Sequence, residues 1–212
     1  MKTCYIACAL DCKIELTPKE QDLIIGADRG YFTLVENGIK PNVALGDFDS
    51  CDGEIDCENT VVFPVKKDYT DSTLAVKYAC EHGYTKIVVF GGIGGELDHT
   101  IANLSLVAEY TEKGIDISFI DGENVLFAIY NSSVSFDEQA KGRISVFSFG
   151  DKAKGVDEKG LLYTLDNYEL SNRIALGVSN EFIGEKSKIS VKEGTLLIYT
   201  SRKNFEKHLT RE

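Results

Sequence analysis

Short apolar runs alternate with amphipathic segments along the first 122 residues. Six of these runs are rich in Ile, Val, Leu and Ala. They predict strands that are buried on both faces, as in a parallel sheet covered by helices. The predicted strands are residues 4–10, 23–27, 43–46, 60–63, 86–90 and 117–121.

Helical patterns lie between these strands. Residues 17–20, Thr-Pro-Lys-Glu, have the spacing of a capping box with proline at the first helical position, so we predict that a helix begins there. Residues 72–82 and 100–113 also have helical patterns, and a glycine follows each of them. Strands that alternate with helices favour a parallel α/β sheet with right-handed crossovers.

The pattern changes after Asp121. Long helical periods give way to short apolar runs separated by Gly, Asn, Asp and Lys, and Glu193-Gly194 is a turn signal between two of the runs. These runs are residues 125–130, 144–149, 189–191 and 195–199. We therefore predict an α/β domain over residues 1–122 and an antiparallel, β-sandwich-like domain over residues 123–212.

Composition excludes some classes of function. The chain is 43% hydrophobic and 27% charged, which is typical of a globular protein and unlike a disordered or fibrous one. Acidic residues outnumber basic ones by 34 to 23, and the resulting charge of -11 argues against general nucleic-acid binding. A nucleotide substrate would need a metal cation between its phosphates and these acidic groups.

The cysteines and the apolar segments bear on location. None of the six cysteines forms a C-x-x-C pair, so reduced cysteines are favoured over a disulfide or metal site. The first apolar run is short and ends at Asp11 and Lys13, unlike a signal peptide. No segment reaches the roughly 18 apolar residues of a membrane span. We therefore expect a cytoplasmic protein with no membrane partner.

Four clusters of small and polar residues carry candidate chemistry. Three of them follow predicted strands, and ligands of parallel α/β sheets bind beyond the carboxyl ends of the strands. Residues 26–30, Gly-Ala-Asp-Arg-Gly, permit a close approach of backbone to ligand, although a plain strand-to-helix turn explains them equally well. Asp47 and Asp49 have the spacing to converge on one Mg²⁺, or else they form an acidic surface turn.

The third cluster, residues 66–73, leads into a predicted helix. Thr70 or Asp71 can cap that helix. Alternatively, the helix amino terminus and Lys66 and Lys67 bind a phosphate, while Asp71 supplies a third metal ligand.

The fourth cluster, residues 91–99, has four glycines in its first five positions. Backbone N–H groups that wrap phosphates would explain them. The cluster lacks the features of a P-loop and of the dinucleotide fingerprint. Acidic groups combined with phosphate-binding loops predict a metal–nucleotide complex, and no serine–histidine pair or zinc-type spacing competes with that interpretation.

In this order and spacing, the clusters resemble the thiamine pyrophosphokinase family. The matching stretches are GADRG, GIKPNVALGDFDS, KKDYTDST, GGIGGELDHTIANL, GLLYTLDNYEL and LGVSNEF, which extend from Gly26 to Phe182. GDFDS with the Thr-Asp step and GG-x-GG-x-x-DH is a specific signature. The resemblance implies the two domains predicted above, a homodimer, and Mg²⁺-dependent transfer of pyrophosphate from ATP to thiamine.

The resemblance also implies roles for individual residues. Asp47, Asp49 and Asp71 are expected to bind the metal and, with Asp98, to be catalytic; Asp71 and Asp98 are both candidates for the general base. The residues expected at the nucleotide are Asp28, Arg29, Lys67, Thr73, Gly92, Gly94, Gly95 and His99. The residues expected at thiamine are Tyr163, Ser179 and Asn180.

The chain departs from the family pattern at three positions. Glu96 stands where arginine is frequent, so Arg29 or Lys67 is the candidate to balance the phosphates. Arg29 itself stands where glycine is frequent, and Tyr163 replaces a tryptophan of some members. Two alternatives are a Mg²⁺-dependent kinase for another small alcohol and a non-catalytic nucleotide sensor. The intact carboxylates named above argue against the sensor.

Overall fold

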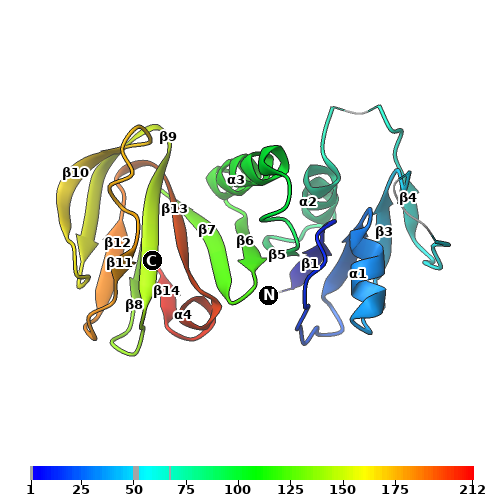
Figure 1. Cartoon of the computed structure of the whole chain (residues 1–212), viewed down its shortest axis with the longest axis horizontal. Coiled ribbons are helices and arrows are strands. Elements are labelled where there is room, and N and C mark those ends of the chain that lie inside the picture. The colour runs from blue at the N-terminus through cyan, green and yellow to red at the C-terminus, as the bar shows by residue number, and fades with distance from the viewer. Residues whose placement is uncertain (1, 50–52, 67) are drawn as a thin grey trace. The chain divides into compact units, whose positions relative to one another are not determined.

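The structure is a computed structural model that describes residues 2–49, 53–66 and 68–212 (Figure 1). Their contacts divide the chain into two compact units. Unit 1 comprises Met1–Leu106 and Gly114–Gly122, and unit 2 comprises Val107–Lys113 and Glu123–Glu212. Helix α3 (Leu97–Glu112) therefore contributes residues to both units.

Unit 1 is built on parallel strands, six of which lie in the described part of the chain. They are β1 (Thr3–Ala7), β2 (Leu23–Ala27), β3 (Val43–Gly46), β4 (Thr60–Val62), β5 (Lys86–Phe90) and β6 (Asp116–Asp121). Their order in the sheet is β4-β3-β2-β1-β5-β6. The chain therefore adds strands on one side of β1 as far as β4 and then continues on the other side with β5. The order reverses between β1 and β5, which is where α/β sheets bind ligands.

Helices α1 (Gly30–Glu36), α2 (Asp71–Glu81) and α3 alternate with these strands. The side chains of Ile6, Ile25, Leu45 and Ile87 are fully buried, which explains why the strands are nearly continuous in apolar residues. None of the helices in the described residues combines the length and the apolar character that a membrane span requires.

The predicted helix at residues 17–20 is wrong. The carboxylate of Asp22 accepts hydrogen bonds from the Lys19 N–H at 2.9 Å and from the Thr3 N–H at 2.8 Å. The segment is therefore held as a turn against β1, and β2 begins at the next residue. The predicted strand 4–10 is also shorter than expected, since β1 ends at Ala7. Helix α1 was not among the predicted elements.

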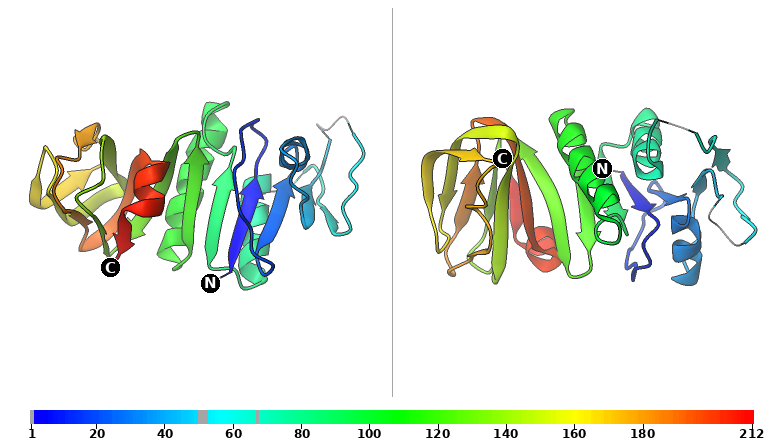
Figure 2. Two further views of the ribbon diagram at one scale, coloured as in Figure 1. Left: turned by 90° about the horizontal axis from the view of Figure 1, so that it is seen from below. Right: turned by 45° about the horizontal axis from the view of Figure 1, so that its top comes forward.

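Unit 2 is an antiparallel β structure, as the sequence predicts. Its elements are β7 (Asn124–Tyr130), β8 (Ser133–Phe136), β9 (Arg143–Lys159), β10 (Leu165–Ser171), β11 (Asn180–Glu181), β12 (Ser187–Ser190), β13 (Glu193–Ser201), α4 (Arg202–Lys207) and β14 (Leu209–Arg211). The first part of β9 pairs with β13, and its last part pairs with β10 and β12. Two further views show β9 as a long curved strand (Figure 2). A parallel α/β unit and an antiparallel β unit confirm the predicted fold class.

Candidate functional site

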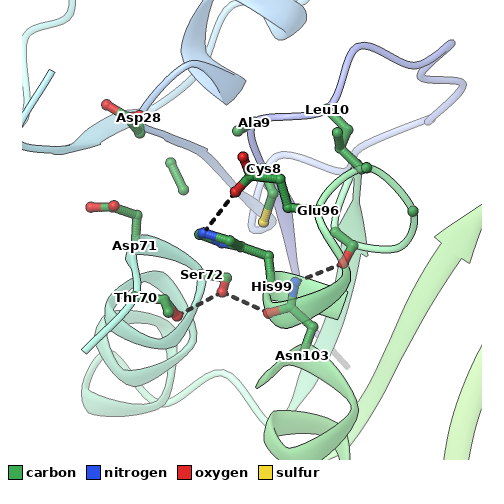
Figure 3. Close-up of a pocket in the computed structure, with 15 residues that line it drawn as sticks. Cys8, Ala9, Leu10, Asp28, Thr70, Asp71, Ser72, Glu96, His99 and Asn103 are labelled. Atoms are coloured by element: carbon green, nitrogen blue, oxygen red, sulfur yellow. Dashed lines mark hydrogen bonds and ion pairs between the residues drawn. The ribbon is translucent and has the colours of Figure 1, made fainter. Parts of the chain in front are cut away.

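Unit 1 contains a cavity of about 440 Å³ at the carboxyl ends of β1, β2 and β5 (Figure 3). This is the point at which the strand order reverses. Of the residues predicted for metal or nucleotide binding, Asp28, Asp71, Gly92, Gly94, Gly95 and His99 line it. Sequence reasoning missed Cys8, Leu10 and Asn103 as lining residues, and it named Thr70 only as a helix cap.

Two acidic loops follow the neighbouring strands β2 and β3. Asp28 has a φ of 51°, and its N–H donates to Leu45 O at 2.7 Å. Phe48, between Asp47 and Asp49, has a φ of 55°. Left-handed backbone is costly for residues with a Cβ and tends to gather at functional sites. Asp47 and Asp49 are not among the cavity-lining residues, but they directly follow β3, which ends beside the loop that contains Asp28.

Asp71 is the first residue of α2, directly after the residue that caps it. The Thr70 side chain accepts from the Thr73 N–H at 3.3 Å, and the Thr70 and Thr73 hydroxyl oxygens are 2.9 Å apart. Thr70 thus supplies the cap, so Asp71 is not needed for that role. In Figure 3 the carboxylates of Asp28 and Asp71 point to the same side of the view.

A buried amide ties α2, α3 and the glycine-rich loop together. The Ser72 hydroxyl donates to Asn103 Oδ1 at 2.8 Å, and Asn103 Nδ2 donates to Gly92 O at 2.6 Å (Figure 3). Both side chains are buried. The two residues are 31 positions apart, so no local spacing could reveal this contact.

Close packing explains why glycine occupies several positions of the fourth cluster. A Cβ on Gly91 would lie 2.4 Å from Leu10 O, one on Gly92 would lie 2.6 Å from the Phe119 ring, and one on Gly95 would lie 2.5 Å from the Leu10 side chain. Gly91 and Gly95 also have positive φ. Close packing therefore accounts for these three glycines by itself, and phosphate binding by the loop stays a prediction.

Polar side chains gather at the start of α3. His99 Nε2 lies 3.5 Å from Glu96 Oε2, and the Asp98 carboxylate accepts from the His99 N–H at 2.9 Å. The candidate ligand atoms of Glu96, Asp98 and His99 lie within 4.8 Å of one another, and all three side chains are exposed. These atoms are close enough together to bind one cation between them.

The charge of the cavity is negative. Asp28, Asp71 and Glu96 line it, and none of the described lining residues is Lys or Arg. Arg29 lies outside the lining and pairs with Asp11 at 3.1 Å, while Lys67 lies outside the described residues. Burial raises the pKa of Cys8 to about 12, so that side chain stays a neutral thiol. Carboxylate oxygens without thiolates suit Mg²⁺, which the sequence predicts.

Unit 2 brings the three predicted thiamine residues together. Asn180 is buried, and its side chain accepts from the Tyr163 N–H at 3.0 Å and donates to Tyr163 O at 2.7 Å. The Tyr163 side chain is 68% exposed. Ser179 has a φ of 57°, its N–H donates to Ser145 Oγ at 3.0 Å, and it lines a second cavity of about 490 Å³.

Comparison with known proteins decides the family. Residues 14–119 match the family profile described as "Thiamin pyrophosphokinase, catalytic domain", and residues 132–196 match "Thiamin pyrophosphokinase, vitamin B1 binding domain". The chain belongs to the thiamin pyrophosphokinase family. The first profile covers the acidic loops and the glycine-rich loop, and the second covers Tyr163, Ser179 and Asn180.

Individual relatives agree with this. A thiamine pyrophosphokinase of Bacillus subtilis (strain 168) is 32% identical over 190 residues, which span 86% of this chain and 88% of the relative. Thiamin pyrophosphokinase 1 of Caenorhabditis elegans is 28% identical over 170 residues, spanning 76% and 69% of the two chains. The crystal structure of the thiamine pyrophosphokinase from Bacillus subtilis superposes with a TM-score of 0.83 at 28% identity, covering 95% of this chain and 99% of that one.

The buried amide network leads to the first prediction. Asn103→Leu should lower the free energy of unfolding by about 1–3 kcal/mol, because the Ser72 hydroxyl and Gly92 O lose their buried partner. The measurement is urea denaturation followed by circular dichroism. Ser105→Ala, an exposed change two residues further along α3, is the control and should leave the midpoint within experimental error. Equal midpoints for the two variants would show that the network contributes no stability.

Proposed function

We propose that the chain transfers the pyrophosphate group of ATP to the hydroxyl of thiamine, giving thiamine diphosphate and AMP. Membership of the thiamin pyrophosphokinase family supports the reaction, and the acidic cavity at the reversal of strand order is the observation that carries it. A cavity lined by carboxylates but by no described Lys or Arg is suited to a polyphosphate only when a cation accompanies it.

The metal would be held by carboxylates of three neighbouring segments. Asp28 and Asp71 line the cavity, and Asp47 and Asp49 follow the adjacent strand β3. Bound to these groups, Mg²⁺ would offset the charge of the phosphate oxygens and of the departing AMP.

The reaction requires one proton transfer. The thiamine oxygen forms a bond to the β-phosphorus of ATP, the bond from that phosphorus to the bridging oxygen of the α-phosphate breaks, and its electron pair leaves with AMP. The hydroxyl proton passes to a carboxylate. We favour Asp71 over Asp98 as this base, because Asp71 lines the cavity and Asp98 is not among the lining residues.

Thiamine recognition belongs to unit 2. The exposed ring of Tyr163 is free of the core and available to stack on an aromatic cation. The backbone at Ser179 and Asn180 would provide polar contacts beside it. The negative charge of the whole chain favours the approach of a cationic substrate.

The products test the reaction directly. Incubation of the protein with ATP, Mg²⁺ and thiamine should yield AMP and thiamine diphosphate in equal amounts, as resolved by ion-pair chromatography. Formation of ADP and thiamine monophosphate would identify an ordinary kinase at the same site. Consumption of neither substrate would leave the nucleotide sensor as the better interpretation.

Removal of one metal carboxylate tests the site. Asp71→Asn or Asp49→Asn should lower turnover at saturating Mg²⁺ by about 100-fold or more, which is typical when one preorganised charge contact of a transition state is lost. Folding should survive, because the change reduces repulsion between neighbouring acidic groups. Asp68→Asn, the same charge change on an exposed residue of the same segment, is the control. Full turnover in the Asp71 variant would refute the metal assignment.

We further propose that two chains form a homodimer with shared active sites. The phosphate groups would bind to unit 1 of one chain, and thiamine would lie against unit 2 of its partner. The proposal is supported by exposed apolar side chains in the two segments of unit 2 that contain the predicted thiamine residues, since exposed apolar groups of this kind suit contact with a second copy of the chain. They are Leu162, Tyr163, Ile174, Leu176, Val178 and Ile183.

Mixing two inactive variants tests this arrangement. Asp71→Asn and Tyr163→Lys, each with its own affinity tag, are unfolded together and refolded in equal amounts. Tyr163 is chosen over Asn180 because its side chain is exposed, so the change should not disturb folding. In a mixed dimer one site carries both defects and the other carries neither, so random pairing should restore roughly a quarter of wild-type sites. Mixed dimers purified through both tags but without activity would refute shared sites.

A further inference from the structure

Unit 2 contains a buried carboxyl group that the proposed reaction does not use. Glu158 lies near the end of β9 and is only 1% exposed. The residues directly opposite it are Leu165 on β10 and Ile189 on β12, so its surroundings on the paired strands are apolar. A buried acidic side chain in such a place is rare unless it is paired or neutral.

Glu158 has one hydrogen bond among the described residues. Asn180 Nδ2 donates to Glu158 Oε2 at 2.9 Å, while Glu158 Oε1 is buried and unpartnered. The Ser187 hydroxyl is also buried without a partner. Ser187 lies two residues before Ile189, so it projects from the same face of β12 as the residue that opposes Glu158. This face of the sheet therefore contains two buried oxygens without a hydrogen-bond partner, Glu158 Oε1 and Ser187 Oγ. Such groups are rare in folded proteins and often have a functional role.

The single partner of Glu158 is the residue that holds Tyr163. Asn180 donates one Nδ2 proton to Tyr163 O and the other to Glu158, and its Oδ1 accepts from the N–H groups of Tyr163 and Glu181. The amide is therefore fully used. Without an acceptor at Glu158, one buried Nδ2 proton would be unpaired, and the amide could turn away from the Tyr163 backbone.

We propose that Glu158 is a positioning residue of the thiamine site, orienting the Asn180 amide so that it clamps the backbone of Tyr163 at the substrate. The proposal rests on the proposed function, since it takes Tyr163, Ser179 and Asn180 as the residues that contact thiamine. Glu158 does not touch the substrate and acts through Asn180 alone.

The protonation state of Glu158 follows from its surroundings. Burial raises the pKa of Glu158 from 4.5 to about 7, against a smaller lowering by the Asn180 hydrogen bond. Each charged residue next to Glu158, or next to a residue that faces Glu158, projects from the other side of its strand, because successive side chains of a strand point to opposite faces. They are Asp157 and Lys159 on β9, Asp166 on β10, Glu181 on β11 and Lys188 on β12. Glu158 is thus a neutral acid below neutral pH.

The raised pKa of Glu158 makes both the stability of the fold and the binding of thiamine depend on pH. The folded protein binds a proton that the unfolded chain releases near pH 4.5, so stability falls as the pH rises from about 4.5 to 7. Above pH 7 a charged carboxylate lies in apolar surroundings, which favours opening of the clamp to water. We expect the KM for thiamine to increase above pH 7, with a smaller change in the KM for ATP.

Two variants separate hydrogen bonding from charge. Glu158→Gln keeps a neutral acceptor for Asn180, so its KM for thiamine should match the wild type at pH 6 and should lack the increase above pH 7. Glu158→Leu removes the acceptor and should raise the KM for thiamine about tenfold, as expected for an unpaired buried donor, with little change in kcat. Ser187→Ala is the control, because it removes the other buried oxygen of this face without touching Asn180.

Two spectroscopic measurements test the clamp without the reaction. The Tyr163 N–H donates to Asn180, so its hydrogen exchange should be slow in the wild type and in Glu158→Gln, and at least tenfold faster in Glu158→Leu. With ¹³C-labelled glutamate, one carboxyl signal should titrate near pH 7 and be absent from Glu158→Gln.

These outcomes distinguish failure of the clamp from failure of the proposed function. Unchanged Tyr163 exchange in a folded Glu158→Leu would overturn the proposal whatever the enzyme does. Equal losses in kcat and in both KM values, shared by Ser187→Ala, would also overturn it, because they would indicate general damage. Protein that shows the exchange effect but does not turn over thiamine would support the clamp and refute the function.

Discussion

The close packing of two backbone loops shapes the candidate site. Strands β1 and β5 are paired as far as Ala7 and Phe90, and the chain continues the contact beyond the sheet through hydrogen bonds from Cys8 N to Phe90 O and from Leu10 N to Gly91 O. Gly91 permits this approach because it has no Cβ. Beyond this contact, the loop after β1, the loop after β5 and the loop that contains Asp28 together line the cavity. This contact therefore holds together the side of the cavity that the loops after β1 and β5 form.

Charge sets a second constraint on the same place. A cavity whose described lining has carboxylates but no Lys or Arg is unfavourable for a polyphosphate by itself. Glu96 adds a further carboxylate to this lining. Binding of metal and nucleotide should therefore be strongly coupled here, since each offsets the charge that disfavours the other.

The sequence predicts the local features of this protein well and the long-range ones poorly. The limits of β2, β3 and β5 agree with the predicted strands, because runs buried on both faces are distinctive. The helix at residues 17–20 fails because Asp22 accepts the N–H groups of Lys19 and of the distant Thr3.

The polar contacts between distant residues show the same limit. Asn103 meets Ser72 across 31 positions, and Glu158 meets Asn180 across 22, so neither pair follows from spacing. Family resemblance names candidate ligand-binding residues, whereas the buried polar partners of those residues become visible only in three dimensions. The metal and nucleotide roles of the individual residues stay predictions until they are tested.

Helix α3 has a consequence for the order in which the chain acquires its structure. Its residues up to Leu106 belong to unit 1, but Val107–Lys113 belong to unit 2, where the Thr195 hydroxyl of β13 donates to Glu112. During synthesis on the ribosome, these last turns of the helix emerge more than 80 residues before that partner. Val107 and Ala108 are buried in the finished protein and cluster with unit 2, so their packing is complete only after the strands of that unit have been made. A nascent chain halted in unit 2 should therefore have an incompletely packed end of α3, and incompletely packed segments are the kind of surface that chaperones bind.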